Sequence, residues 1–410
     1  MEKLGFSTIV FAHILLIPWT LILNLSGVAG RYGAFVLALY LFLSMPQKER
    51  YLSFAKNRVI NILVLSLTLC IAVTSFKVNE LNVYDLAKTT YASKYENNGI
   101  AYGLATSFKV LVSFLFIQYI VDKNGIKTLF CYLFYTVLFY TILVDLSIVL
   151  FGIQENGSGY LIGNKFTVSY LHMFLAVLYQ IKQKVTKKSS RNYSYFLLWA
   201  LVASFLVHCS TAVMGGLLLL VFNLSEYFKK ITYKPIACIV LILSSVLFAF
   251  FYQFILDIPF VQYVIVDILG EDLTLTGRIY IYDAVMQVIE TNPLWGYGIG
   301  NSYQLLHFLY NYPNAQNGFI NLFLEQGILG SVITLALVIV LMYHQVKNRK
   351  KDITYSMICL LYTLIVMAFV EITIDLCFVF LLTLLQITDK NILYSISKQT
   401  NHKNENLSNK

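Results

Sequence analysis

Apolar residues run through this chain in long stretches separated by short polar links. A helix that crosses a membrane needs about 20 such residues. The stretches that approach this length are residues 6–25, 32–45, 59–76, 100–121, 128–151, 167–181, 193–208, 210–225, 235–256, 318–343, 353–370 and 376–388. The pattern predicts an all-α polytopic membrane protein with about twelve transmembrane helices.

Two of these boundaries depend on local polarity. Residues 193–225 are too many for one crossing, and polarity rises at His208-Cys209-Ser210-Thr211, so we expect two helices there. The first stretch lacks the small-residue cleavage site of a signal peptide, so we expect it to remain as the first helix.

Charge supports the same architecture. Only 12% of the residues are charged, about half the share in a soluble domain. With the N-terminus inside, the inner links and both ends hold 23 of the 30 basic residues. This asymmetry predicts that both termini are cytoplasmic. The net charge of +9 is spread over these links, so it does not indicate nucleic-acid binding.

One polar region departs from the pattern, at residues 257–317. Loops this long are usually functional or disordered, and this one is too aromatic for disorder. We therefore divide the chain into helices 1–9 (1–256), an extracellular catalytic loop (257–317), helices 10–12 (318–388) and a cytoplasmic tail (389–410).

Part of this loop has helical spacing. An amphipathic helix near the membrane interface is predicted to end at Asn292-Pro293, because proline cannot continue it. Its apolar positions are Tyr280, Ile281, Ala284, Val285 and Val288.

Arg278 is the loop's one permanent cation. Its guanidinium suits a phosphate, although a surface pair with Asp272 or Asp283 is the simpler alternative. The glycines that follow the predicted helix, at Gly296, Gly298 and Gly300, allow backbone N–H groups to approach a ligand. No strand precedes them, so a nucleotide-binding fold is not indicated.

Where the loop becomes the tenth helix, the sequence reads Gln316-Asn317. Asn317 is a good helix N-cap, and a helix N-terminus also attracts anions. Glu325 follows about two turns inside an apolar stretch, and intramembrane ionisable residues are functional candidates. Lys109 and Asp145 qualify by the same rule.

His307 is the only histidine placed where it can act as a base in this loop, and the alternative is an ordinary helix face. No Cys/His cluster has metal-ligand spacing, so we expect no metal and no cofactor. The six cysteines lie in or beside apolar stretches and are expected to be buried thiols.

An ordered set of segments resembles the O-antigen ligases and Wzy-type polysaccharide polymerases. Specific matching covers about seventy residues. The segments are Thr276-Gly277-Arg278, then Asn292-Pro293-Leu294-Trp295-Gly296-Tyr297-Gly298, then Gln316-Asn317 with Gly327 and Gly330. Weaker blocks fall at Gly163-Asn164-Lys165-Phe166 and Ser210-Thr211.

The resemblance implies transfer of a glycan from a polyprenyl-pyrophosphate donor to a sugar hydroxyl, on the outer face of the bacterial cytoplasmic membrane. Arg278, Gln316, His307 and Glu325 are then the catalytic candidates. The substrate-binding candidates are Asn317, Gly296, Gly298, Asn301, Tyr303, Lys165 and Arg31. The loop aromatics are candidates for stacking on sugars, or for an interfacial belt. They are Tyr280, Tyr282, Trp295, Tyr297, Tyr303, Tyr310 and Tyr312.

This chain departs from the family at one position. The family has a histidine where Gln316 stands, and an amide cannot take a proton at neutral pH. Either Gln316 orients the acceptor, or His307, Glu325 or Glu290 is the base, or positioning and pyrophosphate departure provide most of the catalysis.

Because that histidine is absent, we favour a capsule or O-antigen repeat-unit polymerase over a ligase that transfers finished chains. The non-enzyme alternative is a flippase or transporter of lipid-linked saccharides, which predicts polar residues at the membrane midplane in two related halves. The expected partners are the lipid-linked donor and acceptor, membrane lipid, a chain-length regulator and a flippase.

Overall fold

The structure is a computed structural model that describes residues 2–17, 27–46, 57–78, 83–86, 94–95, 98–153, 158–263, 266–267 and 278–408. Each of the twelve predicted stretches contains a helix. These helices are α1 (Glu2–Leu15), α3 (Gly27–Ser44), α5 (Arg58–Val78), α6 (Gly99–Asp122), α7 (Ile126–Phe151), α8 (Lys165–Val185), α9 (Tyr193–Leu206), α10 (Ser210–Leu224), α12 (Pro235–Leu256), α16 (Gly318–Lys347), α17 (Tyr355–Met367) and α18 (Leu376–Leu384).

Shorter elements connect or extend this bundle. They are η1 (Val83–Leu86), α11 (Glu226–Thr232), α13 (Pro259–Tyr263), α14 (Arg278–Thr291), α15 (Ser302–Tyr310) and α19 (Asp389–Ser408). Strands β1 (Ser158–Tyr160) and β2 (Gly163–Asn164) form a small antiparallel hairpin before α8. The predicted break between α9 and α10 is confirmed, and His208 there has a positive φ of 51°.

Within the described residues, four helices are long and apolar enough to cross a membrane: α5, α6, α7 and α16. The number rises to six if two bent pairs, α10 with α11 and α18 with the start of α19, each count as one crossing. The chain is therefore a helical membrane protein, while the count of twelve crossings stays a prediction.

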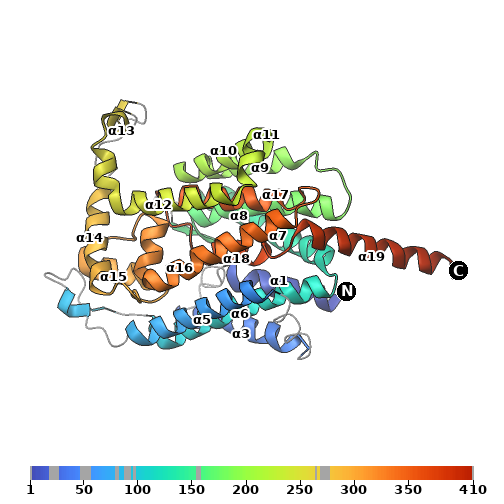
Figure 1. Ribbon diagram of the computed structural model, residues 1–410, viewed down its shortest axis with the longest axis horizontal. Helices are drawn as coiled ribbons and strands as arrows, with labels where there is room; N and C mark the ends of the chain where they lie inside the picture. The colour runs from blue at the N-terminus through green and yellow to red at the C-terminus, as the bar shows by residue number, and fades with distance from the viewer. Residues whose placement is uncertain are drawn as a thin grey trace.

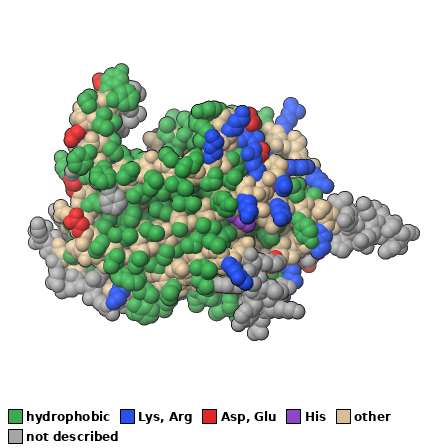
Figure 2. Space-filling view, viewed as in Figure 1, with side chains coloured by type: hydrophobic (Ala, Val, Ile, Leu, Met, Phe, Trp, Pro, Cys, Tyr) green, Lys and Arg blue, Asp and Glu red, His purple; other side chains and the backbone are tan. Residues whose placement is uncertain are grey.

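The bundle has two distinct ends (Figure 1). Both chain termini lie at one end, and α13, α14 and α15 lie at the other. We call these the terminal end and the loop end. Figure 2 shows most of the visible Lys and Arg side chains at the terminal end, whereas Asp and Glu side chains mark the loop end.

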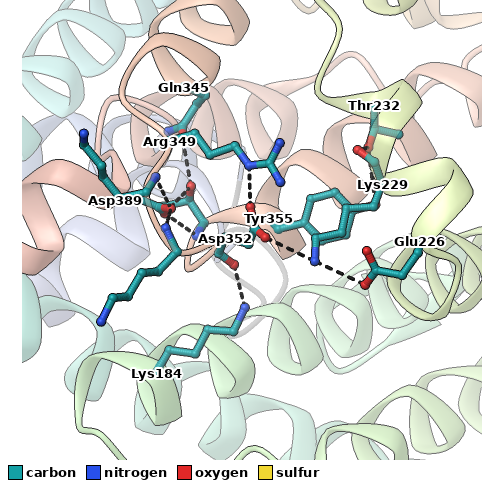
Figure 3. A network of polar contacts seen from close by, with 12 residues as sticks. Lys184, Glu226, Lys229, Thr232, Gln345, Arg349, Asp352, Tyr355 and Asp389 are labelled. Atoms are coloured by element: carbon teal, nitrogen blue, oxygen red, sulfur yellow. Dashed lines mark hydrogen bonds and ion pairs between the residues drawn. The ribbon is translucent and has the colours of Figure 1, made fainter.

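Polar side chains fasten the terminal end (Figure 3). The buried Asp389 carboxylate accepts hydrogen bonds from the backbone N–H groups of Lys350, Lys351 and Thr354 at 2.8–3.1 Å. Nearby, Asp352 pairs with Arg349 at 2.6 Å and with Lys229 at 3.1 Å. These contacts tie the end of α16 and the start of α17 to α11 and α19.

The predicted amphipathic helix is confirmed as α14, which ends at Thr291 before Asn292-Pro293. Its buried face includes Tyr282, Val285 and Val288. Tyr280, which we assigned to the apolar face, is 61% exposed instead. It is two positions from Tyr282 and therefore about 200° away around the helix.

Candidate functional site

The site at the loop end is organised by the first nine residues of α16. Asn317 is its N-cap, and its side-chain oxygen accepts from the N–H groups of Phe319 (2.9 Å) and Ile320 (3.0 Å). The helix breaks at Gly327, whose φ of 61° and ψ of −170° lie in a region essentially reserved for glycine. The spacing between Asn317 and Gly327 therefore encodes a short helical segment, and the predicted single helix is wrong at this point.

The loop segment 293–298 supplies hydrogen-bond partners to the backbone groups at the break. The carbonyls of Pro293 and Leu294 accept from the N–H groups of Ile328 (2.8 Å) and Leu329 (3.3 Å). In return, Tyr297 N–H donates to the carbonyl of Leu324 at 2.8 Å, and Gly298 N–H donates to that of Glu325 at 2.9 Å. Backbone groups that a helix break would leave unpaired are thereby satisfied.

This docking requires glycine on both sides. A Cβ on Gly327 would lie 2.4 Å from the Leu294 carbonyl oxygen, and a Cβ on Gly296 would lie 2.5 Å from the Gly327 nitrogen. Both neighbours are backbone atoms, which cannot move aside. The two glycine-bearing sequence segments therefore form one structural unit, which we call the backbone lock.

The link between α17 and α18, residues 368–375, lies directly against the start of α16. Gly318 N–H donates to the carbonyl of Ala368 at 2.8 Å, and the Asn317 amide donates to that of Phe369 at 2.9 Å. The Tyr282 hydroxyl lies 3.2 Å from the Gln316 carbonyl oxygen and 3.5 Å from that of Phe369. These contacts bring α14, the α16 start and the 368–375 link together.

Arg278 begins α14 and shares the electrostatic environment of this link. Burial raises the pKa of Glu371, which is 5% exposed, while the nearby charges of Arg278 and Lys165 oppose that rise. Burial also raises the pKa of Tyr282 to about 12, again opposed by Arg278. The charges of two predicted cations from distant segments thus act on one buried carboxylate, which forms no ion pair with either of them.

The β1–β2 hairpin places Lys165. Asn164 ends β2 and caps α8, accepting from the N–H groups of Phe166 (3.1 Å) and Thr167 (3.0 Å). Lys165 is the first residue of that helix, and its Nζ lies 3.4 Å from the His208 carbonyl oxygen in the α9–α10 turn. It is half-buried, as is Arg278. The ammonium therefore keeps donors available to a ligand.

Gln316 and Asn317 are adjacent but differ in their surroundings. Asn317 is fully buried, and its amide bonds to the backbone groups of Phe319, Ile320 and Phe369 and to the Tyr282 hydroxyl, as a structural cap. Gln316 has a positive φ of 51°, and its backbone N–H donates to Asn314 Oδ1 at 2.8 Å. Its half-buried side chain forms no hydrogen bond with the described residues. Only Gln316 presents a free amide.

The other two catalytic candidates lie on different sides of α15. Glu325 is on the short segment before the break, not within a long straight helix, and accepts a hydrogen bond of 2.8 Å from the Ser302 hydroxyl. His307 is exposed and stacks on Tyr303 with the ring centroids 5.7 Å apart. No described contact joins His307 to Arg278 or Glu371.

Asn301 serves the loop rather than an open surface. It is 4% exposed, and its amide donates to the Tyr297 carbonyl at 2.8 Å while its oxygen accepts from Asn98 N–H at 2.7 Å. Asn98 in turn donates to the Gly300 carbonyl. The glycine-rich turn is thus attached to the start of α6.

The loop aromatics divide by exposure. Tyr282 and Tyr297 are 0% and 1% exposed, so neither can stack on a sugar. Tyr280 and Tyr303 are more than half exposed and keep that role as a prediction. The Arg31 side chain and residues 276–277 lie outside the described residues. Over the described ranges, His, Cys, Asp and Glu form no group of three suited to a metal ion.

Our reading of the sequence overlooked Glu371, because we placed it between two apolar stretches and gave that link no role. A signal was present in Glu371-Ile372-Thr373-Ile374-Asp375. This segment holds two carboxylates in a region with few charges. Acidic residues between two apolar helices indicate a polar surface that the helices have to enclose.

Comparison with known proteins finds a similarity over part of the chain. Residues 195–335 match the family model described as O-antigen ligase, and this range includes Arg278, both sides of the backbone lock and Gln316. Lys165 and Glu371 lie outside it. No curated protein matches the chain. Over residues 195–335, about a third of its length, this membrane protein is therefore similar to the O-antigen ligase family.

Proposed function

We propose that this protein polymerises polyprenyl-pyrophosphate-linked oligosaccharide repeat units into capsular or O-antigen polysaccharide. The observation that carries the proposal is that the charges of Arg278 and Lys165 act on the buried Glu371, in the link that the Tyr282 hydroxyl of α14 contacts at Phe369, in a chain whose residues 195–335 match the O-antigen ligase model. Two cations at one end of an apolar bundle suit a pyrophosphate on a lipid anchor.

The proposed arrangement in the membrane follows from charge. The terminal end, rich in Lys and Arg, faces the cytoplasm, and the loop end faces outward. Both termini are then cytoplasmic, and residues 257–317 form the extracellular catalytic loop between the two groups of helices. Twelve crossings of a bacterial cytoplasmic membrane remain part of this proposal.

In the proposed reaction, an acceptor hydroxyl oxygen attacks the anomeric carbon of the donor glycan. The bond from that carbon to the pyrophosphate oxygen breaks, polyprenyl pyrophosphate departs, and the hydroxyl proton passes to a base or to solvent. Arg278 and Lys165 stabilise the negative charge that develops on the departing pyrophosphate, which is the role of preorganised cations in such transfers.

Gln316 has a positioning role in this scheme. Its amide cannot accept a proton at neutral pH, but it can hold the acceptor hydroxyl by a hydrogen bond. The backbone lock fixes the start of α16, and hence Gln316, relative to Arg278 through Tyr282. Most of the catalytic effect then comes from orientation and leaving-group stabilisation.

A second candidate function is transfer of a finished glycan to a different acceptor. The description of the matching family, O-antigen ligase, favours it. Both reactions use the same donor chemistry, so the Arg278 site is common to them and the acceptor distinguishes them.

The test is surface glycan length in cells that carry Arg278→Ala, with protein levels checked in the membrane. A polymerase defect leaves single repeat units at the surface, a ligase defect leaves polymer unattached to its acceptor, and a flippase defect leaves no saccharide outside. Arg191→Ala, an exposed substitution in the link between α8 and α9, is the matched control and should leave the glycan unchanged, because the end of α8 contacts Asp352 at the terminal end. Normal polymer in Arg278→Ala cells would contradict the proposal.

A further inference from the structure

A cavity of about 440 Å³ opens among α1, α5, α6, α16 and α18. This volume lies in the range of small-molecule sites. The loop-end parts of the cavity come from Gly300 and Ser302, from Glu325, and from Asp375 at the start of α18. Arg278 and Lys165 are not among the lining residues, although Thr167 and Ile372, close to Lys165 and Glu371 in sequence, are. The cavity therefore adjoins the Arg278 site but has its own lining.

The lining changes in character along the bundle. Toward the loop end it holds Asn321, Glu325 and Asp375, and away from that end it holds Val110, Phe114, Leu337 and Leu382. Lys109 lies between these two zones on α6. It is ten residues, or about 15 Å, from the first residue of that helix. A ligand that is polar at one end and apolar at the other matches this gradient.

No described residue supplies a counter-ion to Lys109. The side chain is 3% exposed, and its ammonium forms no hydrogen bond or ion pair with any described residue. Its Nζ lies 5.5 Å from the centre of the Tyr102 ring. Tyr102 precedes Lys109 by seven residues, so the lysine side chain extends toward the loop end of α6. Burying an ammonium without a counter-charge is costly, so the position calls for an anionic ligand.

Two further polar atoms in the same cavity lack partners. Thr106 Oγ1, one turn from Lys109 on the same helix, and Asn321 Oδ1 on α16 are buried and form no hydrogen bond. Buried polar groups in folded proteins are almost always satisfied. Three unpartnered groups around one cavity indicate a ligand rather than isolated packing defects.

The two carboxylates of the cavity have donors of their own. Glu325 accepts from the Ser302 hydroxyl at 2.8 Å, and Asp375 Oδ1 caps α18 through Cys377 N–H (2.8 Å) and Phe378 N–H (3.1 Å). Both carboxylates line the polar zone of the cavity, and a carboxylate can accept further hydrogen bonds from sugar hydroxyls. An anion alone would be repelled there, whereas a phosphate joined to a sugar places hydroxyls next to them.

We propose that this cavity binds the phosphate-bearing head of a second lipid-linked saccharide, the acceptor. Its phosphate lies on Lys109 and Thr106, its first sugar lies near Asn321 and Glu325, and its lipid chain begins along Val110, Phe114 and Leu382. This rests on the proposed function and deepens it. A polymerase joins two lipid-linked substrates and needs two phosphate sites, at Arg278 for the donor and at Lys109 for the acceptor.

The binding test is native mass spectrometry of the full-length protein in detergent with undecaprenyl pyrophosphate as the probe. Wild type should bind two molecules, Lys109→Met and Arg278→Gln one each, and the double variant none. Lys109→Arg should restore the second molecule, because it restores the charge. Lys77→Gln, an exposed substitution at the loop end of α5, is the matched control and should still bind two.

A kinetic test separates the two sites. With purified lipid-linked repeat units, Lys109→Met should raise the acceptor KM by roughly ten- to hundredfold, the range expected for losing a charged hydrogen bond. The donor KM should stay unchanged. A merely structural lysine would change both constants or the protein yield.

Each outcome decides a different claim. If Lys109→Met still binds two lipid phosphates, the further inference is wrong while the Arg278 site stands. A wild type that binds only one molecule, lost in either variant, shows one shared site and also overturns the inference. Binding that survives Arg278→Gln and vanishes with Lys109→Met removes the donor assignment instead. If phosphatidylglycerol occupies the Lys109 position and the probe does not displace it, the site serves phospholipid and the acceptor assignment fails.

Discussion

The two ends of the helix bundle hold themselves together by different means. At the terminal end, side-chain charges form the fastening, with Asp389 on three backbone N–H groups and Asp352 between Arg349 and Lys229. At the loop end, backbone hydrogen bonds between residues 293–298 and 324–329 hold the segments together. The ammonium of Lys109 and the atoms Thr106 Oγ1 and Asn321 Oδ1 at that end have no hydrogen-bond or ion-pair partner among the described residues.

This difference teaches how structural and functional polar groups can be separated in a membrane protein. Polar groups that stabilise the fold are satisfied in the folded chain itself. Polar groups that bind a ligand are positioned by other contacts, and their own donors or acceptors stay unpaired within the protein. The backbone lock serves this purpose, because it positions the loop end without using the side chains that face the site.

The largest effect on stability is expected from Gly327→Ala, which disrupts the backbone lock. The methyl group would meet the Leu294 carbonyl at 2.4 Å in a backbone region reserved for glycine. We expect a loss of about 4 kcal/mol in the free energy of unfolding, from strain and overpacking together. Thermal unfolding in detergent measures it.

Gly152→Ala is the matched control for that substitution. Gly152 has a similar backbone conformation (φ 80°, ψ 178°), but a Cβ there meets no atom within 4 Å. Only the strain remains, about 2 kcal/mol. Equal losses in the two variants would show that the docking contributes nothing.

Asp389→Ala removes the carboxylate that fastens the terminal end. It leaves three N–H groups without their acceptor at a position only 1% exposed, so we expect a loss of about 3 kcal/mol. Glu226→Ala removes an exposed ion pair to Lys229 and should change stability by less than about 0.5 kcal/mol. In the folded fraction of Asp389→Ala, glycan transfer should persist, because the site lies at the other end. Lost transfer in correctly folded protein would break the comparison.

Glu371→Gln sharpens the description of the loop end. The raised pKa means that Glu371 takes up its proton at a higher pH than an ordinary glutamate. As the pH falls, the negative charge beside Arg278 disappears, and an anionic donor should bind more tightly. The donor KM should therefore fall in wild type as the pH is lowered from 8, and the fall should begin above the pH at which an ordinary glutamate titrates.

In Glu371→Gln that pH dependence should be absent, with a donor KM at pH 8 lower by roughly fivefold, or about 1 kcal/mol. Transfer kinetics over this pH range measure both effects. A higher donor KM in Glu371→Gln would show that the carboxylate orients Arg278 rather than opposing the donor.

The smallest expected effect concerns Asp352 at the terminal end. Although burial raises its pKa, hydrogen bonds from Arg349, Lys229 and Tyr233 outweigh this and hold the pKa below its usual value. A depressed folded-state pKa means that the stabilisation is present above about pH 4 and is lost as the pH falls through the folded-state value. Asp352→Asn should therefore lose less stability than wild type between pH 5 and pH 3. The difference should stay below about 1 kcal/mol for this partly exposed pair. Parallel thermal melts of the two proteins would show no such difference if the pairing were weak.

The sequence was sufficient to predict the helices and the polar loop, because both follow from local properties. Apolar stretches located the twelve helices, and Asn292-Pro293 located the end of α14. The break at Gly327 escaped prediction, since Gly327 lies inside an apolar stretch and its unpaired backbone groups are satisfied by residues about thirty positions earlier. Such a repair is a tertiary effect that hydropathy does not report.

The site was predicted in part for the same reason. Arg278 stood out as the one permanent cation of the loop and Lys165 followed only from the resemblance, but their shared effect on Glu371 depends on how distant segments pack together. Tyr282 and Tyr297 were predicted as candidates for stacking on sugars, but both are buried. The sequence could not show this, because the residues that bury them are distant along the chain. Lys109 was visible as an intramembrane charge, whereas its lack of a partner required the structure.

The central claim is that Arg278 stabilises the departing pyrophosphate. Elongation of a defined lipid-linked repeat unit by purified protein tests it most directly, with wild type compared with Arg278→Gln at equal thermal stability. We expect kcat/KM to fall by at least about a hundredfold, as when a preorganised transition-state donor is removed. Elongation by Arg278→Gln at the wild-type rate would contradict it.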